Sequence, residues 1–319
     1  MDVALTAVDV VTFGESMGSI RAAGLLRFGG TMNMTMGGAE SNVAIGLARL
    51  GHAVRWVGRL GDDEVGEYVL RMLRAESVDT ERVTLDTARR TGLMLVEKRL
   101  PDIARVAYYR AGSAGSALGI PDLDGAFDAS TRILHVTGIT PALSPSAAEA
   151  ALWAVRTAKE LGVLVSFDVN YRAALWSREA ASAVLTELAR AADIVFASDD
   201  ELSLVADGET EEHAAQALLA AGVDQVVVKR GADGAIAWHG TQSTSVPARK
   251  VAAVDTIGAG DAFTAGYLSA LLDGENVAAR LDRGAVLGAF AVSAAADWEA
   301  SPTRRELSML DHAPGSTLR

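Results

Sequence analysis

The sequence predicts an α/β protein built on a mostly parallel sheet that is covered by helices on both faces. From residue 132 onward, short β-rich runs alternate regularly with runs of helical periodicity. This order implies right-handed crossover connections, which make neighbouring strands parallel and bury the sheet on both faces. The size agrees with this class, because 319 residues, half of them apolar, provide a large core without disulfide bonds.

The first part of the chain begins with a β-rich run over residues 8–13 that ends at Gly14, which is typical of a buried strand. The turn that follows does not match the G-x-G-x-x-G dinucleotide fingerprint, which argues against a dehydrogenase. Residues 18–36 show no regular element. Later elements are expected as helices over 43–50 and 65–73, a strand over 54–60 and a hairpin over 92–110.

The rest of the chain continues the alternation and ends in two long helices. The predicted strands cover residues 133–136, 163–167, 194–196, 225–228, 235–238 and 244–246. The predicted helices cover residues 146–161, 180–191, 211–220, 261–272 and 276–295. Because no linker rich in Pro or Ser and no internal repeat divides the chain, we expect a single domain over residues 1–319.

The composition excludes several classes of function. The formal net charge of −12 argues against nonspecific nucleic-acid binding, since phosphate contacts need clustered Lys and Arg. The absence of cysteine excludes disulfides, cysteine zinc sites and cysteine nucleophiles. No apolar run approaches the length of a membrane-spanning helix, and the N-terminal residues do not resemble a secretory signal. We therefore expect a cytoplasmic protein that binds neither nucleic acid nor membranes.

The string VDTIGAGDAFTAG at residues 254–266 carries the strongest chemical signal. Gly258, Ala259 and Gly260 allow backbone N–H groups to approach a ligand closely, and the first turn of the helix that follows favours an anion. Asp261, at the same helix start, is well placed to accept a proton beside a bound phosphate. These four residues therefore predict a phosphoryl-transfer site. The alternative is an ordinary glycine loop in which Asp261 caps the helix.

The longer string D-T-x-G-A-G-D, from Asp255 to Asp261, resembles the signature of the ribokinase-like (PfkB) carbohydrate kinases. The resemblance implies a three-layer α/β/α sandwich with a small β-sheet lid contributed by about residues 15–36 and 92–112. It also implies transfer of a phosphoryl group from ATP to a sugar hydroxyl. Asp261 is then the general base, and the backbone N–H groups of residues 257–260 surround the transferring phosphoryl group.

The sugar site follows from three further motifs of this family. The form G-G-A-E-S-N at residues 37–42 resembles the 2-keto-3-deoxygluconate kinase branch, as do Y-x-R at 108–110 and F-D-x-N-x-R at 167–172. The substrate residues implied are Gly37, Gly38, Asn42, Tyr108, Arg110, Asn170, Arg172 and Asp261. A sugar acid also needs a cationic partner, and the planar guanidinium group suits a carboxylate. The alternatives are tight glycine packing, a solvated Arg110 and a structural ion pair at Arg172.

The nucleotide site follows from the same resemblance. The string KRGADG at residues 229–234 matches the K-x-G-x-x-G loop of the family, and the small residues of 285–296 would cover the adenine. The nucleotide-binding residues implied are Ser198, Lys229, Gly231, Gly234, Gly258, Gly260, Ala289 and Ser293. A β-turn between two strands and close helix packing are the structural alternatives.

The metal sites depend on a motif that this chain alters. The N-x-x-E motif of the family reads Ser198 to Glu201 here, so that Glu201 keeps the carboxylate that would hold Mg²⁺ through water, while Ser replaces Asn. An acidic helix start is the alternative. By analogy, a K⁺ site is expected near Asp255 and the carbonyl group of Ile257. Ala296 stands where the branch more often has Gly.

Together these motifs predict an ATP- and Mg²⁺-dependent kinase that phosphorylates a primary hydroxyl group of 2-keto-3-deoxygluconate or a close sugar acid. A fructokinase or other neutral-sugar kinase is the alternative within the family. A sugar- or nucleotide-binding regulator without catalysis is the alternative from another class, against which the intact glycines and Asp261 argue. The expected partners are the sugar, ATP and, through the lid, a second copy of the chain.

Overall fold

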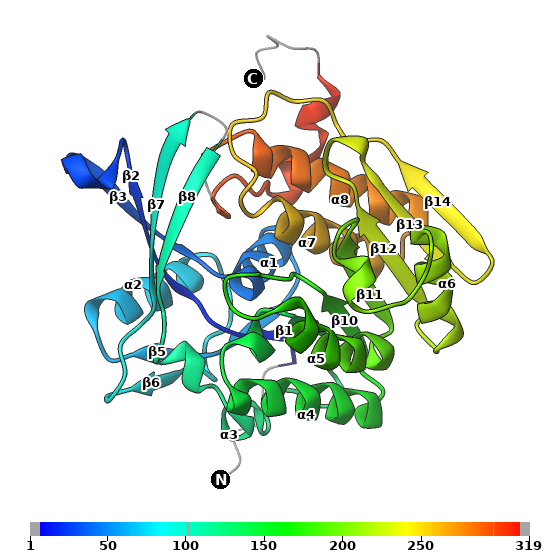
Figure 1. Ribbon diagram of the computed structural model, residues 1–319, viewed down its shortest axis with the longest axis horizontal. Helices are drawn as coiled ribbons and strands as arrows, with labels where there is room; N and C mark the ends of the chain where they lie inside the picture. The colour runs from blue at the N-terminus through cyan, green and yellow to red at the C-terminus, as the bar shows by residue number, and fades with distance from the viewer. Residues whose placement is uncertain (1–6, 101–102, 296, 313–319) are drawn as a thin grey trace.

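A sheet of eight strands runs through the middle of the molecule, and the computed structural model describes residues 7–100, 103–295 and 297–312 around it (Figure 1). In spatial order the strands are β14 (Gln242–Val246), β13 (Ala235–His239), β12 (Gln225–Lys229), β11 (Ile194–Ser198), β10 (Leu164–Asp168), β9 (Ile133–Thr137), β1 (Val10–Phe13) and β4 (Val54–Val57). Neighbours from β4 to β12 are parallel, and β13 and β14 add an antiparallel edge. The predicted α/β class is confirmed.

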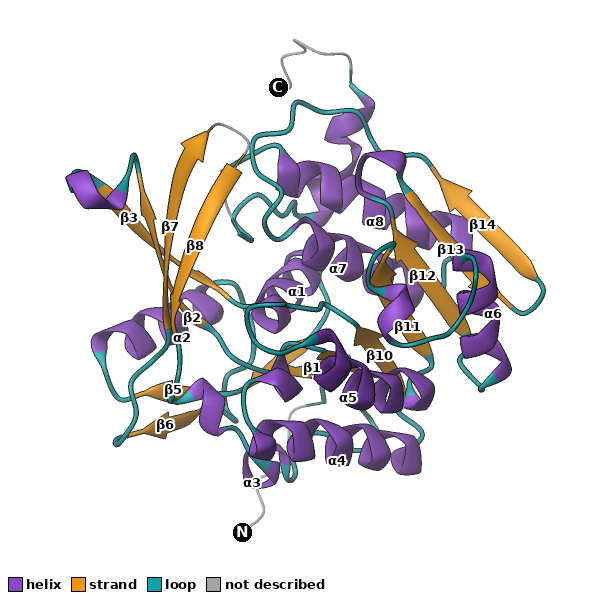
Figure 2. Cartoon of the chain, in the orientation of Figure 1, coloured by secondary structure: helices purple, strands orange, loops and turns teal. Residues whose placement is uncertain are grey.

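Helices cover both faces of this sheet, so that the molecule has three layers (Figure 2). One face carries α3 (Ile120–Leu123), α4 (Pro145–Leu161), α5 (Arg178–Ala191) and α6 (Glu211–Ala220). The other carries α1 (Ala39–Arg49), α2 (Glu64–Ala75), α7 (Ala259–Leu272) and α8 (Val277–Val292). Successive side chains of a strand point to opposite faces. Val11 and Phe13 of β1 therefore pack with α4 and α5, whereas Val10 packs with α1 and α7.

Several of the helices begin at a polar side chain that caps them. Ser144, Ser177 and Thr210 precede α4, α5 and α6, and each accepts a hydrogen bond from the backbone N–H group three residues later. Asn276 caps α8 in the same way. Short 3₁₀ turns complete the chain at Leu26–Phe28, Gly115–Ala117, Thr140–Ala142, Leu202–Leu204, Gly231–Asp233 and Arg304–Asp311. Within the described residues, no helix has both the length and the apolar character needed to cross a bilayer.

A second, smaller sheet stands beside the main body, on the left in Figure 1. Its strands, in spatial order, are β3 (Met32–Gly37), β2 (Met17–Ala22), β7 (Leu93–Leu100) and β8 (Ile103–Tyr109). The hairpin expected over 92–110 is present, but the expectation of irregular structure over 18–36 is wrong for residues 18–22 and 32–36. There β2 pairs with both β3 and β7, and these long-range backbone hydrogen bonds form regular strands that the local sequence does not reveal.

The single strand expected over 54–60 is divided in two at Gly58. The first part is β4, and the second, β5 (Arg59–Gly61), leaves the large sheet to pair with β6 (Thr84–Asp86). A Cβ atom on Gly58 would lie 2.4 Å from the ring of Trp56, so the chain can pass this point only with glycine.

Candidate active site

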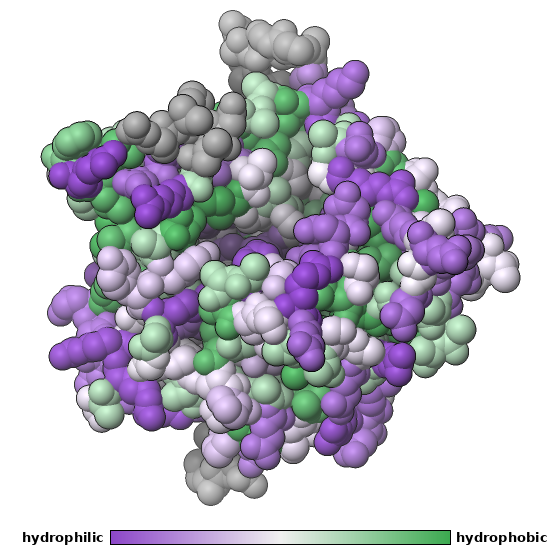
Figure 3. All heavy atoms as spheres, in the orientation of Figure 1, coloured by the Kyte–Doolittle hydropathy of each residue, from purple (hydrophilic) through white to green (hydrophobic). Residues whose placement is uncertain are grey.

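Three neighbouring strands of the large sheet end at the same edge in a polar residue. Asp168 ends β10, Ser198 ends β11 and Lys229 ends β12. Ligands of open α/β sheets bind outside the carboxyl ends of the strands, and here the first turn of α7 brings Asp261 to the same place. Figure 3 shows the surface hollowed between the small sheet and the main body.

Two cavities meet at this edge. One has a volume of about 450 Å³ and is lined by Met94, Val106, Tyr108, Asn170, Arg172, Ser198, Glu201, Lys229, Gly231, Thr256, Ile257, Gly258, Gly260 and Asp261. The other, of about 420 Å³, lies toward α8. Lys229, Gly231, Thr256 and Gly260 line both cavities. We call the first the substrate cavity and the second the nucleotide cavity, after the ligands that the sequence motifs predict.

Asp261 is buried, and neutral amides hold both of its carboxylate oxygens. Asn42 of α1 donates from Nδ2 to Oδ2 at 2.9 Å, and Asn170, after β10, donates from Nδ2 to Oδ1 at 3.3 Å. Asn170 has a φ of 41°, a left-handed conformation that asparagine tolerates better than most residues. Within the described residues Asp261 forms no ion pair, so its charge is not neutralised by direct contact with a cation.

Burial raises the pKa of the Asp261 carboxyl group, and the nearby charge of Asp168 acts in the same direction. The hydrogen bond from Asn42 and the positive charges of Arg172 and Lys229 oppose this rise. A carboxylate with a raised pKa is a stronger base at neutral pH. The geometry and the charge distribution at Asp261 both suit a proton acceptor.

The loop before α7, residues 254–258, is shaped by close contacts. Gly258 has a φ of 77°, and a Cβ atom there would lie 2.1 Å from the carbonyl oxygen of Asp297. Two of the four N–H groups expected around the phosphoryl group already have acceptors: Ile257 donates to Asp255 Oδ1 and Ala259 donates to the Thr256 carbonyl, both at 3.3 Å. Gly258 and Gly260 carry the other two N–H groups, at a helix start that favours an anion. We call residues 254–258 the anion loop.

Lys229 lies at the junction of the two cavities and is held there by Asp168. Its ammonium nitrogen lies 2.6 Å from Asp168 Oδ2, which also accepts a hydrogen bond from Thr264 of α7 at 3.0 Å. Asp168 thereby joins the ends of β10 and β12 to α7. Lys229 is where a phosphate group shared between the cavities would be neutralised.

Glu201 lines the substrate cavity and connects the loops that follow two strands. Its Oε1 accepts from the backbone N–H group of Tyr171 at 2.7 Å, and its Oε2 accepts from that of Ser198 at 2.9 Å. The side chain of Ser198 donates to Asp200 at 2.7 Å. Each oxygen of Glu201 keeps lone pairs for a water molecule or a cation.

The two arginines expected to bind a sugar acid have different surroundings. Arg172 is exposed, lines the substrate cavity and donates to the Tyr171 carbonyl at 3.1 Å, and it forms no ion pair with the described residues. Arg110 instead forms a largely buried ion pair with Glu15, at 2.5 and 2.6 Å. Tyr108 does line the cavity, with its ring centroid 5.5 Å from the Arg110 guanidinium group.

Gly37 and Gly38 do not line either cavity. A Cβ atom on Gly38 would lie 2.4 Å from the carbonyl oxygen of Glu15, and one on Gly37 would lie 2.5 Å from the side chain of Met94. Both glycines therefore allow close packing between α1, the small sheet and the loop after β1. Of this motif, only Asn42 reaches Asp261.

The nucleotide cavity contains most of the residues expected around the base and phosphates. Gly231, Gly234 and Ala289 line it, together with Phe263 and Val292. Ser293 does not line it, and donates instead to the carbonyl group of Phe290 at 2.7 Å. Ala296 lies outside the described residues.

Asp255, expected near a monovalent cation, is neutralised by cations of the chain itself. Arg21 of β2 donates to its Oδ2 at 3.1 Å, and the Lys98 ammonium group of β7 lies 3.4 Å from the same atom. The same guanidinium group also binds Asp297 at 2.8 Å. No sequence pattern predicts this cluster, because its members are far apart along the chain. Asp168, in contrast, could be expected at the site, since it directly follows the predicted strand over residues 163–167.

Comparison with known proteins adds an independent line of evidence. Residues 7–304 match the model of the pfkB family of carbohydrate kinases. The 2-dehydro-3-deoxygluconokinase of Bacillus subtilis (strain 168) is 37% identical over 306 residues, which cover 94% of both chains. The 5-dehydro-2-deoxygluconokinase of Shouchella clausii (strain KSM-K16) is 33% identical over 310 residues, which cover 95% of both.

Solved structures agree with the fold. A PfkB protein from Polaromonas sp. JS666 superposes with a TM-score of 0.86 at 39% sequence identity, covering 95% of this chain and 99% of that chain. A putative ribokinase II from E. coli in complex with ATP and Mg²⁺ gives a TM-score of 0.88 at 24% identity, with the same coverage. The second likeness concerns the fold alone.

Proposed function

Because the chain belongs to the pfkB family of carbohydrate kinases, we propose that it transfers the γ-phosphoryl group of ATP to a primary hydroxyl group of 2-keto-3-deoxygluconate or a close sugar acid. The observation that carries the proposal is the position of Asp261. It lines the substrate cavity at the start of α7, beside the junction with the nucleotide cavity. We place this activity in the cytoplasm.

In this proposal the chain contributes a base and a set of phosphate donors. Asp261 accepts the proton of the attacking hydroxyl group, while its two asparagine partners fix the direction of the carboxylate. Gly258 and Gly260 bring backbone amides to the transferring phosphoryl group, and Lys229 neutralises charge between the two cavities. The acceptor and donor are then held in one geometry, which is the main requirement of phosphoryl transfer.

The carboxylates near the junction suit Mg²⁺ bound mainly through water and phosphate. Within the described residues no group of three His, Cys, Asp or Glu side chains could hold a metal by itself. Mg²⁺ needs only one or two carboxylates in such sites. Glu201 lines the cavity, and Asp168 Oδ1 is buried without a hydrogen-bond partner in the described part of the chain. A bound Mg²⁺ would neutralise charge on the ATP phosphates. We do not extend the proposal to K⁺, since Arg21 and Lys98 already neutralise Asp255.

The choice of a sugar acid rests on Arg172 and on the relatives. Both named relatives are kinases of dehydro-deoxygluconates, which are sugar acids. Arg172 lines the substrate cavity and is available for a carboxylate, whereas Arg110 is already paired. A planar guanidinium group binds a carboxylate through two parallel hydrogen bonds. We therefore assign the carboxylate of the substrate to Arg172.

The experiment that tests this function is a screen of ATP consumption coupled to identification of the phosphorylated product. The panel contains 2-keto-3-deoxygluconate, 5-keto-2-deoxygluconate, fructose and a nucleoside. We expect the largest kcat/KM for a sugar acid, at least about tenfold above fructose, because the carboxylate adds a charge-assisted contact. Turnover of fructose alone would overturn the substrate assignment. Binding of sugar and nucleotide in calorimetry without any product would indicate a non-catalytic regulator.

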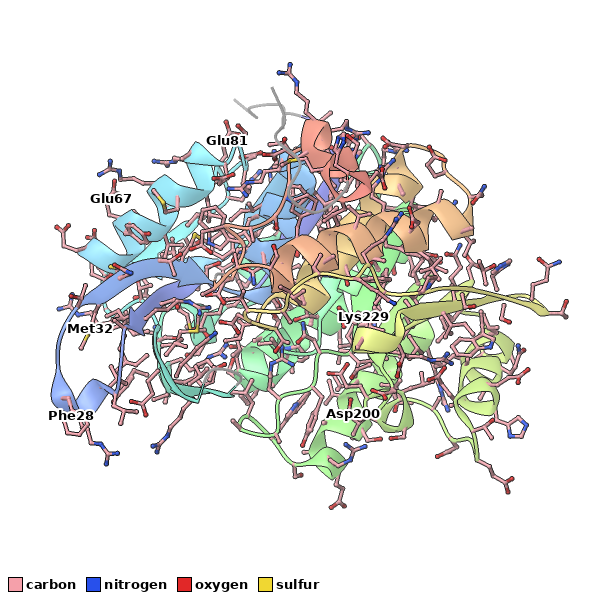
Figure 4. All side chains as sticks on the ribbon, turned by 90° about the horizontal axis from the view of Figure 1, so that it is seen from above. Phe28, Met32, Glu67, Glu81, Asp200 and Lys229 are labelled. Atoms are coloured by element: carbon pink, nitrogen blue, oxygen red, sulfur yellow. The ribbon has the colours of Figure 1, made fainter. Side chains whose placement is uncertain are left out.

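The proposal also includes a homo-oligomer formed through the small sheet. The face of this sheet that points away from the substrate cavity exposes Met32, Met34 and Tyr109, and Phe28 lies next to it. Figure 4 places Phe28 and Met32 at the outer end of the small sheet, far from Lys229. Light scattering of the purified protein measures the oligomeric state directly, and a monomer at all concentrations would exclude this part.

A further inference from the structure

The anion loop is tied to the small sheet by two cationic side chains. Arg21 and Lys98 lie on the face of that sheet that carries Met94 and Tyr108, which line the substrate cavity. The guanidinium group of Arg21 bridges Asp255 Oδ2 at 3.1 Å and Asp297 Oδ1 at 2.8 Å. The ammonium group of Lys98 donates to the Val254 carbonyl at 2.8 Å and lies 3.4 Å from Asp255.

The contacts of Arg21 are largely buried, and with Lys98 the cluster is balanced in charge. The exposed fraction of the side chain is 4% for Asp255, 1% for Asp297 and 14% for Arg21. Two carboxylates face two cations, and removal of one partner from such a group leaves a buried charge uncompensated, which is strongly unfavourable. The position of the small sheet and the position of the two carboxylates are therefore linked.

Both aspartates contact the anion loop directly, Asp255 through its carboxylate and Asp297 through its backbone carbonyl group. Asp255 belongs to the loop, and its Oδ1 accepts the N–H group of Ile257 at 3.3 Å. The carbonyl oxygen of Asp297 fills the space where a side chain on Gly258 would lie. On the other side, the loop is attached to the end of α8, because Val254 and Asp255 donate to the Val292 carbonyl at 2.7 and 3.3 Å. Arg21 holds the loop from the opposite side, where the small sheet faces the substrate cavity.

We propose that Arg21 is a positioning residue for phosphoryl transfer, which couples the small sheet to the anion loop by bridging Asp255 and Asp297. The proposal rests on the kinase function proposed above. The sheet contributes Met94 and Tyr108 to the substrate cavity. A shift of the sheet over a bound sugar would therefore move, through Arg21, the loop amides that meet the phosphoryl group. Arg21 also supplies a fixed positive charge at Asp255, so the chain needs no added monovalent cation for this purpose.

The test compares Arg21→Gln and Arg21→Lys with a matched control, Arg105→Gln. Arg105 is an exposed arginine on the opposite face of the same sheet, near Glu97. We expect Arg21→Gln to lower kcat by about tenfold or more, because small displacements of a catalytic geometry have large effects on rate. The KM for ATP should change much less. Arg21→Lys should keep part of the activity, and added guanidinium or potassium ions should restore part of it in Arg21→Gln alone.

A second readout does not depend on activity. Hydrogen–deuterium exchange of the amides of residues 254–260 should be faster in Arg21→Gln than in the wild type, and unchanged in Arg105→Gln. If the wild type phosphorylates no member of the panel, the proposed function fails, and this exchange experiment still decides the coupling. Unchanged kcat and unchanged exchange in Arg21→Gln would overturn the inference. So would an equal loss of kcat, ATP affinity and thermal stability, which would indicate a general structural role.

Discussion

Two kinds of buried carboxylate lie at the active-site edge of this molecule, and the chain holds them in opposite ways. Asp261 accepts hydrogen bonds from two asparagine amides and faces the substrate cavity. Asp168 and Asp255 are held by the cations Lys229 and Arg21. All three carboxylates are nearly inaccessible to solvent. They differ in whether the protein itself neutralises the negative charge.

The difference separates a chemical role from an architectural one. An amide orients a carboxylate and leaves its charge to be neutralised by a proton or a ligand, whereas a cation neutralises it within the protein. Burial raises the pKa of Asp261, as a proton acceptor requires. The ion-paired carboxylates instead join elements that are far apart in the sequence. We therefore expect Asp261 to be the carboxylate that reacts, and Asp168 and Asp255 to be the carboxylates that hold the site together.

The largest effect that follows from this comparison is expected for Asp261→Asn. This variant keeps the shape of the side chain and removes the proton acceptor, so kcat should fall by about 10²–10⁴-fold. The affinity for ATP should remain close to that of the wild type, because Asp261 does not line the nucleotide cavity. Steady-state kinetics on the best substrate and calorimetry with ATP measure the two quantities.

Asp168→Asn is the matched variant, since it neutralises an equally buried carboxylate that is held by a cation. Its main effect should be a higher KM for ATP, because Lys229 loses the partner that directs it toward the junction of the cavities. If Asp261→Asn keeps turnover within about tenfold of the wild type while Asp168→Asn does not, the roles of the two carboxylates are reversed.

Local sequence patterns were sufficient to predict the main body of the fold. The strands and helices after residue 132 follow from hydrophobic periodicity, and their boundaries differ by only a few residues from those of the structure. The small sheet was predicted in part. Its hairpin of β7 and β8 is local, whereas β2 pairs with β7, some 70 residues away, and β3 joins the sheet only through β2, which a local pattern cannot show.

The site was predictable where a motif falls at a strand or helix end. Asp261, Lys229 and Glu201 converge because parallel strands bring their carboxyl ends to one edge. The pairing of Arg110 with Glu15 was not predictable, since the two residues are 95 positions apart and a sequence does not show which charge is already neutralised. The same reason hides the contacts of Arg21, which span more than 230 positions.

The same comparison can be made between two arginines, since Arg172 forms no ion pair with the described residues and Arg110 is paired with Glu15. Substitution of Arg172 should have an effect on kcat/KM of intermediate size. Arg172→Lys should lower kcat/KM for a sugar acid by about 10–100-fold, because a lysine cannot form the paired hydrogen bonds of a guanidinium group. Its effect on fructose should be smaller. Arg110→Lys serves as the matched variant. It should reduce thermal stability through the ion pair with Glu15, and it should change the preference for acids much less. Equal losses on both substrates in Arg172→Lys would contradict the assignment of the carboxylate.

The smallest effect is expected on the pH dependence of kcat/KM, when an amide that donates to Asp261 is removed. Asn42 donates to the ionised carboxylate and so lowers its pKa, in opposition to burial. Activity requires the ionised form and is lost as the pH falls through this pKa. Asn42→Ala removes a donor to the ionised form, so the pKa rises further and the acid limb of the kcat/KM profile moves to higher pH. A hydrogen bond worth about 0.5–1.5 kcal/mol corresponds to a shift of about one pH unit or less.

Asn170→Gly is the comparison for this shift, because glycine accepts the φ of 41° at that position and the bond from Asn170 is longer, at 3.3 Å against 2.9 Å. Its acid limb should therefore move less than that of Asn42→Ala. The position of the limb is the quantity to compare, since the loss of a sugar contact would lower the whole profile without moving it. A limb that stays in place or moves to lower pH in Asn42→Ala would mean that another group controls the profile. The type of hydrogen-bond partner would then not distinguish the reacting carboxylate, Asp261, from the ion-paired carboxylates.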